Sequence, residues 1–268
     1  MQTEMGHDLH LSGHGSSTGG FYRNVHLEGL STIDGDVVCE QCTAHGVARM
    51  HGNLRADMTA FHGKADVLGD MVTGSAEIHG TIRVSGVCDV AKILRIHGTS
   101  RLQGGVRADV LNIHGRTHVG AECVAREVEL HGIAQFAQDI RAERMDCSGV
   151  LHLGGPCEAE SFSCKGQVHS SGLINAERVH IRLHAKSEVQ EIGCTELRVE
   201  RGRGWFARRH KLVVDIIEGD HIYVENVVAK RIRGNRITLG NGVYAERVEY
   251  REELNRHHGA KVKEAVQV

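Results

Sequence analysis

Histidines recur at one fixed place in a repeated pattern of this sequence. Of the 20 histidines in the chain, six directly precede a glycine and follow one another at a nearly constant interval. The six are His45, His62, His79, His97, His114 and His131. Imidazole nitrogens bind transition metals and titrate near neutral pH, so a column of them suggests a metal-binding or pH-responsive protein. The alternative is a structural ladder, in which neutral rings stack from copy to copy.

Six equivalent histidines argue against catalysis, because a catalytic histidine normally works alone with one nucleophile and one orienting partner. The chain also has no Gly-x-Ser-x-Gly, P-loop or His-Glu-x-x-His motif. We therefore predict a protein that is not an enzyme and has no cofactor. We interpret the column as structural and expect no resident metal, with metal binding and pH sensitivity as the alternatives.

The eight cysteines are the second set of reactive groups. Cys39 and Cys42 have the Cys-x-x-Cys spacing of redox and zinc sites, but a second such pair is missing, so a four-ligand zinc site is not expected. Most cysteines occupy positions where neighbouring repeats carry isoleucine, leucine or valine. We expect them to be small hydrophobic core residues.

A glycine repeat positions all of these residues. Nine glycines follow one another at a constant interval, except that the step from Gly80 to Gly98 is longer by one residue. They are Gly29, Gly46, Gly63, Gly80, Gly98, Gly115, Gly132, Gly149 and Gly166. Apolar residues alternate around each glycine, which indicates short strands with glycine at the corners. The sequence thus predicts an all-β fold, a single-stranded parallel β-helix (β-solenoid) with roughly 17 residues per turn. A dozen such turns would extend about 60 Å.

Three segments follow from composition. Residues 1–20, rich in Gly, Ser and His, predict a flexible N-terminal tail; residues 21–250 predict the β-helix domain; residues 251–268 predict a charged C-terminal tail. Neither tail provides an apolar cap, so the open ends of the helix are expected to recruit a second copy. The expected polymer contacts are Leu27, Ile33, Ile237, Leu239, Val248 and Tyr250.

One insertion, at residues 201–211, interrupts the repeat. It contains the only tryptophan of the chain among basic residues. The residues are Arg201, Arg203, Trp205, Phe206, Arg208, Arg209 and Lys211. A solvated loop is the simpler interpretation. The functional interpretation is contact with a membrane or a partner, in which the aromatic rings enter the lipid boundary and the cations lie near anionic headgroups.

Charge and composition exclude other classes. Lys and Arg total 32 against 34 Asp and Glu, so a basic nucleic-acid-binding surface is not expected. The sequence shows no signal segment and no apolar run of membrane-spanning length, which predicts a cytoplasmic protein.

The sequence resembles the bactofilins, the polymer-forming cytoskeletal proteins of bacteria, and in particular a longer subgroup from spore-forming Gram-positive bacteria. The resemblance rests on the Gly-x5-Gly corner pattern and on residues 11–20, 25–29, 33–36, 217–225, 233–240 and 248–250. It implies a right-handed, three-faced β-helix that assembles end to end into filaments without nucleotide. It also implies a location at the inner face of the cell membrane, where such filaments organise cell-shape, cell-wall or motility proteins.

The main rival is a left-handed β-helix acyltransferase built from hexapeptide repeats. Three complete hexads per turn would require a repeat one residue longer than the one that dominates here, and no third glycine appears in the repeat. A metal-binding or pH-responsive solenoid that uses the histidine column is the second rival. We predict a self-assembling scaffold that binds itself and no nucleic acid.

Overall fold

The computed structural model describes residues 6–202 and 210–268. The chain divides into two compact units, residues 1–137 and residues 138–268. Each unit is a parallel β-solenoid, as the glycine repeat predicts, and the described residues contain no helix. Within the same ranges, therefore, no helix has the length and hydrophobicity that a membrane crossing requires.

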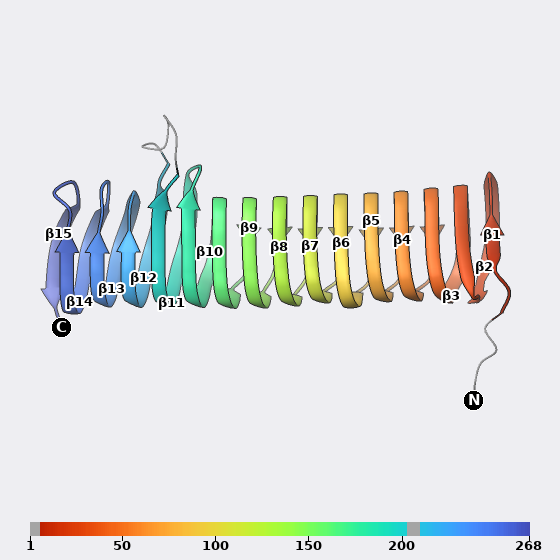
Figure 1. The fold of residues 1–268 in the computed structure, drawn as a ribbon, viewed down its shortest axis with the longest axis horizontal. Helices are drawn as coiled ribbons and strands as arrows, with labels where there is room; N and C mark the ends of the chain where they lie inside the picture. The colour runs from red at the N-terminus through yellow and green to blue at the C-terminus, as the bar shows by residue number, and fades with distance from the viewer. Residues whose placement is uncertain (1–5, 203–209) are drawn as a thin grey trace. The chain divides into compact units, whose positions relative to one another are not determined.

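The first unit contains the strands β1 to β8, which stack as successive turns (Figure 1). They are β1 (Leu9–Leu11), β2 (His14–Phe21), β3 (Asn24–Met50), β4 (Leu54–Val67), β5 (Met71–Val84), β6 (Cys88–Leu102), β7 (Val106–Val119) and β8 (Cys123–Phe136). Equivalent residues of the repeat pair with each other: His45 with His62, and Gly46 with Gly63. The predicted register is thus confirmed over these turns.

The one longer step of the repeat is a local irregularity at a corner. Thr73 pairs with Val90, whereas Ala76 pairs with Leu94, so β6 contains one residue more than β5 between these two pairs. On the other side of β6, Val90 pairs with Ala108 and Ile93 with Val110, so β7 again lacks the extra residue. The extra residue of β6 therefore lies between Val90 and Ile93, and the strands on both sides keep their inward and outward faces.

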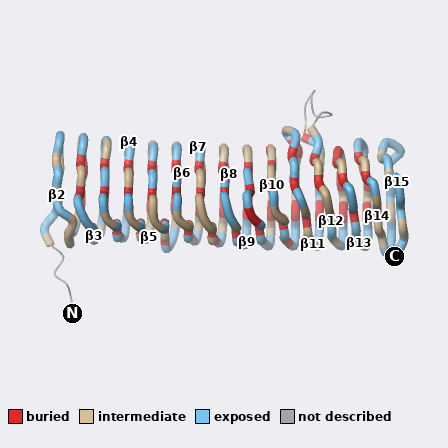
Figure 2. The backbone as a smooth tube through the Cα atoms, turned by 180° about the vertical axis from the view of Figure 1, so that it is seen from behind, coloured by how far each residue is buried: buried red, intermediate tan, exposed pale blue. Residues whose placement is uncertain are grey.

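The core of the first unit is a continuous stack of small and medium apolar side chains. From β3 to β8, buried positions recur at alternate residues along the strands between more exposed ones (Figure 2). One inward column runs through Phe61, Ile78, Ile96 and Ile113, each at most 1% exposed. Because no single turn could cover these side chains, the turns are stable only as a stack.

The glycine column is required by backbone geometry. Gly98 has a φ of 137°, and a Cβ atom there would overlap the carbonyl oxygen of Gly80 on the preceding turn. The same relation holds between Gly115 and Gly98. Any larger residue would meet both a strained φ and a steric clash, which explains the regularity of the repeat.

The second unit contains the strands β9 to β15. They are β9 (Ile140–Leu153), β10 (Cys157–Leu183), β11 (Ser187–Arg201), β12 (Leu212–Val224), β13 (Val227–Leu239), β14 (Tyr244–Arg256) and β15 (Lys261–Gln267). The turns change length along this unit: the turn from Leu212 to its partner Val227 is shorter by two residues than the turn from Tyr244 to its partner Lys261. This variation explains why the glycine repeat is hard to follow beyond Gly166.

Strands also occupy both segments for which the sequence predicted tails. In residues 1–20, β1 places Leu9 and Leu11 in register with Val25 and Leu27, so the apolar column extends one turn further. In residues 251–268, β14 continues to Arg256 and β15 pairs with β14. The tail predictions relied on composition, but a terminal turn has little apolar surface to bury and pairs through its backbone.

Candidate functional site

The six predicted histidines form a ladder on the surface of the first unit. Five steps join ring centroids 4.8–5.1 Å apart, with interplanar angles that rise from 4° at His45–His62 to 22° at His114–His131. The rings are exposed or half-buried and lie at the corner beside the glycine column. The inter-strand spacing of a parallel sheet imposes this distance on identical side chains in register.

The ladder extends two steps beyond the predicted column. His26 lies 5.8 Å from His45 and His10 lies 4.8 Å from His26, in both cases with tilted rings. His26 precedes its glycine by three residues instead of one, so reading a single column missed it. His10 pairs with His26 between β1 and β3, a contact that becomes evident only when the register of these two strands is known.

Carboxylates flank three rings of the ladder. Glu77 lies 2.9 Å from Nε2 of His79, Glu129 lies 2.9 Å from Nε2 of His131, and Glu28 lies 3.0 Å from Nε2 of His26. The hydrogen bond from His79 holds the pKa of the Glu77 carboxyl below its ordinary value. Each pair joins residues two apart on one strand, and therefore on the same face.

Glu77, His79 and His97 are the one group of potential metal ligands among residues 6–202 and 210–268 in which three donor atoms lie within 4.8 Å of one another. Two imidazoles and a carboxylate are a ligand set that suits zinc and related divalent metals.

A second histidine stack lies in the other unit and was not predicted. His152 and His169 are 5.1 Å apart with an interplanar angle of 9°. Burial, followed by the neighbouring His169, lowers the pKa of His152. These residues follow their glycines by three positions, a column that contains histidine in only some turns.

The cysteines are core residues, with one exception. Seven are buried, whereas Cys194 is half-buried, and all eight are free thiols. Burial raises the pKa of Cys88 and of Cys157 to about 12, so neither is a thiolate at neutral pH. The prediction of a packing role is therefore confirmed for the buried seven and is wrong for Cys194.

The basic-aromatic insertion lies only partly within the described residues. Arg203, Trp205, Phe206, Arg208 and Arg209 lie outside the described residues. Arg201 and Lys211, on either side, are exposed.

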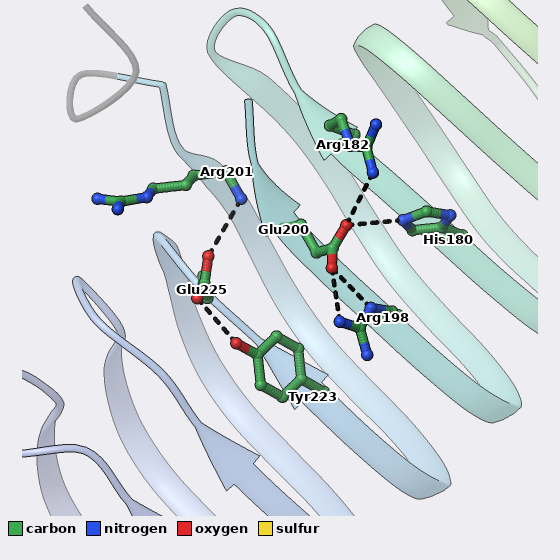
Figure 3. A network of polar contacts seen from close by, with 7 residues as sticks. All are labelled: His180, Arg182, Arg198, Glu200, Arg201, Tyr223 and Glu225. Carbon is green, nitrogen blue, oxygen red and sulfur yellow. Dashed lines mark hydrogen bonds and ion pairs between the residues drawn. The ribbon is translucent and has the colours of Figure 1, made fainter. Parts of the chain in front are cut away.

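A dense ionic network lies where the chain enters this insertion (Figure 3). Oε1 of Glu200 accepts from Arg198 Nε at 2.7 Å, and Oε2 accepts from Arg182 at 3.2 Å and contacts Nε2 of His180 at 3.2 Å. Together these partners, Arg198 foremost, lower the pKa of Glu200 to about 2.

A second carboxylate, Glu225, continues the network toward the next turn (Figure 3). It accepts from the backbone N–H of Arg201 at 3.4 Å and from the hydroxyl of Tyr223 at 2.8 Å. The stem of the insertion is thus tied to Glu225, the residue that directly follows β12.

The predicted polymer contacts lie one turn inside the terminal strands. Leu27, Ile33, Ile237, Leu239 and Val248 are all at most 1% exposed, and Tyr250 is half-buried. Strands β1 and β2 pair with β3 at one end, and β15 pairs with β14 at the other. The accessible terminal residues are instead those of β1, β2 and β15, because each prediction placed the last turn too early.

No protein-family model matches this chain, and no solved structure matches it. Two curated proteins of Bacillus subtilis (strain 168) are similar to part of it. The "Uncharacterized protein YhbF" is 39% identical over 79 residues, which are 29% of this chain and 34% of that protein. The "Uncharacterized protein YhbE" is 37% identical over 83 residues, 29% of this chain and 35% of that protein. The matched part thus spans about a third of each relative.

Proposed function

We propose that this protein is a self-assembling scaffold, a bactofilin-like solenoid that forms filaments without nucleotide by stacking terminal turns end to end. The proposal rests on the observation that the apolar column continues to the terminal strands and is left partly uncovered there. Leu9 and Leu11 in β1, and Val262 in β15, are half-buried. Their partners one turn inside, Leu27 for Leu11 and Ala245 for Val262, are buried.

The backbone of the terminal strands supports the same conclusion. In the described ranges, β2 pairs only with β3, and β15 pairs only with β14. Each therefore presents one row of peptide groups to which another strand can add. A second copy of this chain is the occupant that fits, because its terminal turn has the same cross-section and spacing.

The two edge strands, β2 and β15, differ in the charge they carry and therefore in how readily another strand can pair with them. Strand β2 (His14–Phe21) contains no Lys, Arg, Asp or Glu. Strand β15 (Lys261–Gln267) contains Lys261, Lys263 and Glu264. Charged side chains on an edge, lysine above all, disfavour strand addition. We therefore assign the stronger contact to the edge formed by β1 and β2.

Electron microscopy of the purified protein, with and without nucleotide, tests the assembly. The parent is expected to form filaments in both conditions. Leu11→Lys, which puts a charge into the uncovered end of the column, is expected to abolish them. Met58→Lys is the control, because Met58 is already 57% exposed on β4, away from either terminal strand.

Dispersed parent protein at high concentration would contradict the proposal. Filaments that persist in Leu11→Lys, with its β-sheet circular dichroism intact, would contradict the assignment of the edge. The corresponding change in β15 is Val262→Lys, for which a weaker effect is expected.

Residues 201–211 are proposed as the contact with an anionic membrane surface or a partner protein at the inner face of the cell membrane. Support comes from the exposed Arg201 and Lys211 and from the network that anchors the stem of this segment. Each cation near such a surface contributes about 1 kcal/mol, so an array of copies binds far better than a single one. A Trp205→Ala, Phe206→Ala variant should lose flotation with anionic liposomes; unchanged flotation would refute membrane contact through these rings.

A further inference from the structure

We propose that Glu77, His79 and His97 form a binding site for a divalent transition-metal ion such as Zn²⁺ on the histidine ladder. The site lies wholly within the first unit, on strands β5 and β6, and it is independent of the proposed assembly. Glu77 and His79 come from one strand, two residues apart, and His97 is the partner of His79 on the next turn.

The donor atoms are already gathered. Glu77 Oε1 lies 2.9 Å from His79 Nε2, and all three donors lie within 4.8 Å of one another. Bonds of about 2.0–2.1 Å to a tetrahedral ion place two ligand atoms roughly 3.3 Å apart, so the donors must converge by about 1.5 Å at most. Rotation of surface side chains provides this movement, since His79 is 41% and Glu77 50% exposed.

The hydrogen bond between Glu77 and His79 also prepares the site electronically. An ion that binds Nε2 displaces the proton between Oε1 and Nε2, and the neutral ring then carries its single proton on Nδ1. Two imidazoles and one carboxylate then leave room for water in the remaining position, as in open zinc sites.

The other steps of the ladder lack one or more of these features. At His45–His62 the residues that correspond to Glu77 are Thr43 and Ala60, neither of which is a carboxylate. At His97–His114 they are Arg95 and Asn112.

The step from His114 to His131 is the nearest comparison. It has Glu129, bonded to His131 at 2.9 Å, but its rings are turned by 22° instead of 5°, and its donors do not gather within the same limit. Glu129 is therefore a matched control for Glu77.

One neighbouring charge opposes the ion. Arg95 stands in register with Glu77 on the next turn, and its charge helps to lower the pKa of Glu77. A guanidinium at this position repels a bound cation. Removing the charge of Arg95 should therefore tighten metal binding. If the ladder were purely structural, the same substitution would not change metal binding.

Isothermal titration of the full chain with ZnCl₂ at neutral pH, repeated with NiCl₂, tests the site. Glu77→Gln and His97→Gln should each weaken the strongest site by about tenfold or more, because each removes a ligand. Glu129→Gln should leave it within about twofold, since the two carboxylates lie three turns apart. Arg95→Gln should strengthen it. Other histidines, such as those near residue 10, contribute equally to all variants and cancel in the comparison.

Cobalt absorption provides an independent reading. The parent should give visible d–d bands typical of tetrahedral Co²⁺, and these bands should disappear in Glu77→Gln. Circular dichroism verifies the β fold of each variant. Equal Zn²⁺ affinity in the parent and Glu77→Gln, or an equal loss in Glu129→Gln, would overturn the proposal. Affinity that is unchanged by His97→Gln would do the same.

Discussion

Glu200 is expected to stabilise the second unit in a way that depends on pH, and Glu200→Gln tests this. The carboxylate receives two contacts from Arg198, at 2.7 Å from Nε and 2.6 Å from Nη2, and one each from Arg182 and His180 at 3.2 Å. The amide of glutamine has nearly the same shape but no charge. The substitution therefore removes the charge of the network without opening a cavity.

The pKa of Glu200 sets the size of the effect. It falls from 4.5 to about 2, with the Arg198 hydrogen bond as the main cause. At about 1.36 kcal/mol per pKa unit the upper limit is about 3 kcal/mol. Because the Glu200 side chain is 21% and Arg198 53% exposed, solvent screening reduces this to about 1–2 kcal/mol.

The direction in which stability changes with pH follows from the lowered pKa of Glu200. The folded form loses its proton more readily than the unfolded form, so the stabilisation is complete above the unfolded pKa, near 4.5. It is lost progressively as pH falls from about 4.5 toward 2. Glu200→Gln should therefore cost about 1–2 kcal/mol at pH 7 and little at pH 2.

Urea unfolding followed by circular dichroism, at several values between pH 2 and pH 7, measures the difference. Glu188→Gln is the control: Glu188 also pairs with a cation, Lys186, but both side chains are more than half exposed, at 52% and 64%. It should change stability far less. A difference between parent and Glu200→Gln that is the same at pH 7 and pH 2 would refute the electrostatic explanation.

Two further predictions concern the repeat itself. Gly98→Ala should be strongly destabilising, by about 2 kcal/mol or more, because it combines a φ of 137° with a backbone clash. Gly105→Ala is the control and should cost far less, since its Cβ would lie 3.2 Å from the nearest atom. Thermal unfolding compares the two variants, and equal losses of stability would contradict the steric explanation. Burial and the neighbouring His169 lower the pKa of His152, so the folded state resists protonation of this ring. The stability of the fold should therefore decline as pH falls through the pKa that His152 has in the unfolded state. His152→Gln should flatten this decline between pH 7 and pH 5, and an unchanged pH profile would show that the stack is not responsible.

Most of the first unit could be predicted from the glycine repeat, and the reason is steric. A corner glycine such as Gly98 is confined by the carbonyl of Gly80, so the spacing of glycines reports the register directly. Once the register is known, His79 must lie beside His97. The histidine ladder was therefore a geometric consequence of the sequence pattern.

The rest could not be predicted, because it depends on turns that do not share this corner. His26 is displaced by two positions in the repeat, and His10 belongs to a short strand in a segment of tail-like composition. In the second unit, the interval between partners on β10 and β11 changes from 19 residues at His169–Glu188 to 18 at Arg182–Glu200, so no constant period indicated the partners of Glu200 on the preceding turn. Sequence spacing predicts contacts only where the corner geometry is constant.

The same reasoning locates where a repeated solenoid can acquire a specific function. Identical turns give identical steps, so the ladder alone offers every ion the same weak pair of imidazoles at about the same spacing. One step of the ladder gains a different ligand set only where the residue type changes in the neighbouring column, as at Glu77, whose partners on the adjacent turns are Ala60 and Arg95. In the proposed assembly, contact likewise becomes specific only where the stack ends and the apolar column is partly uncovered. The interior repeats thus provide the regular spacing, and under both proposals it is the substitutions within them, together with the terminal strands, that determine what the solenoid binds.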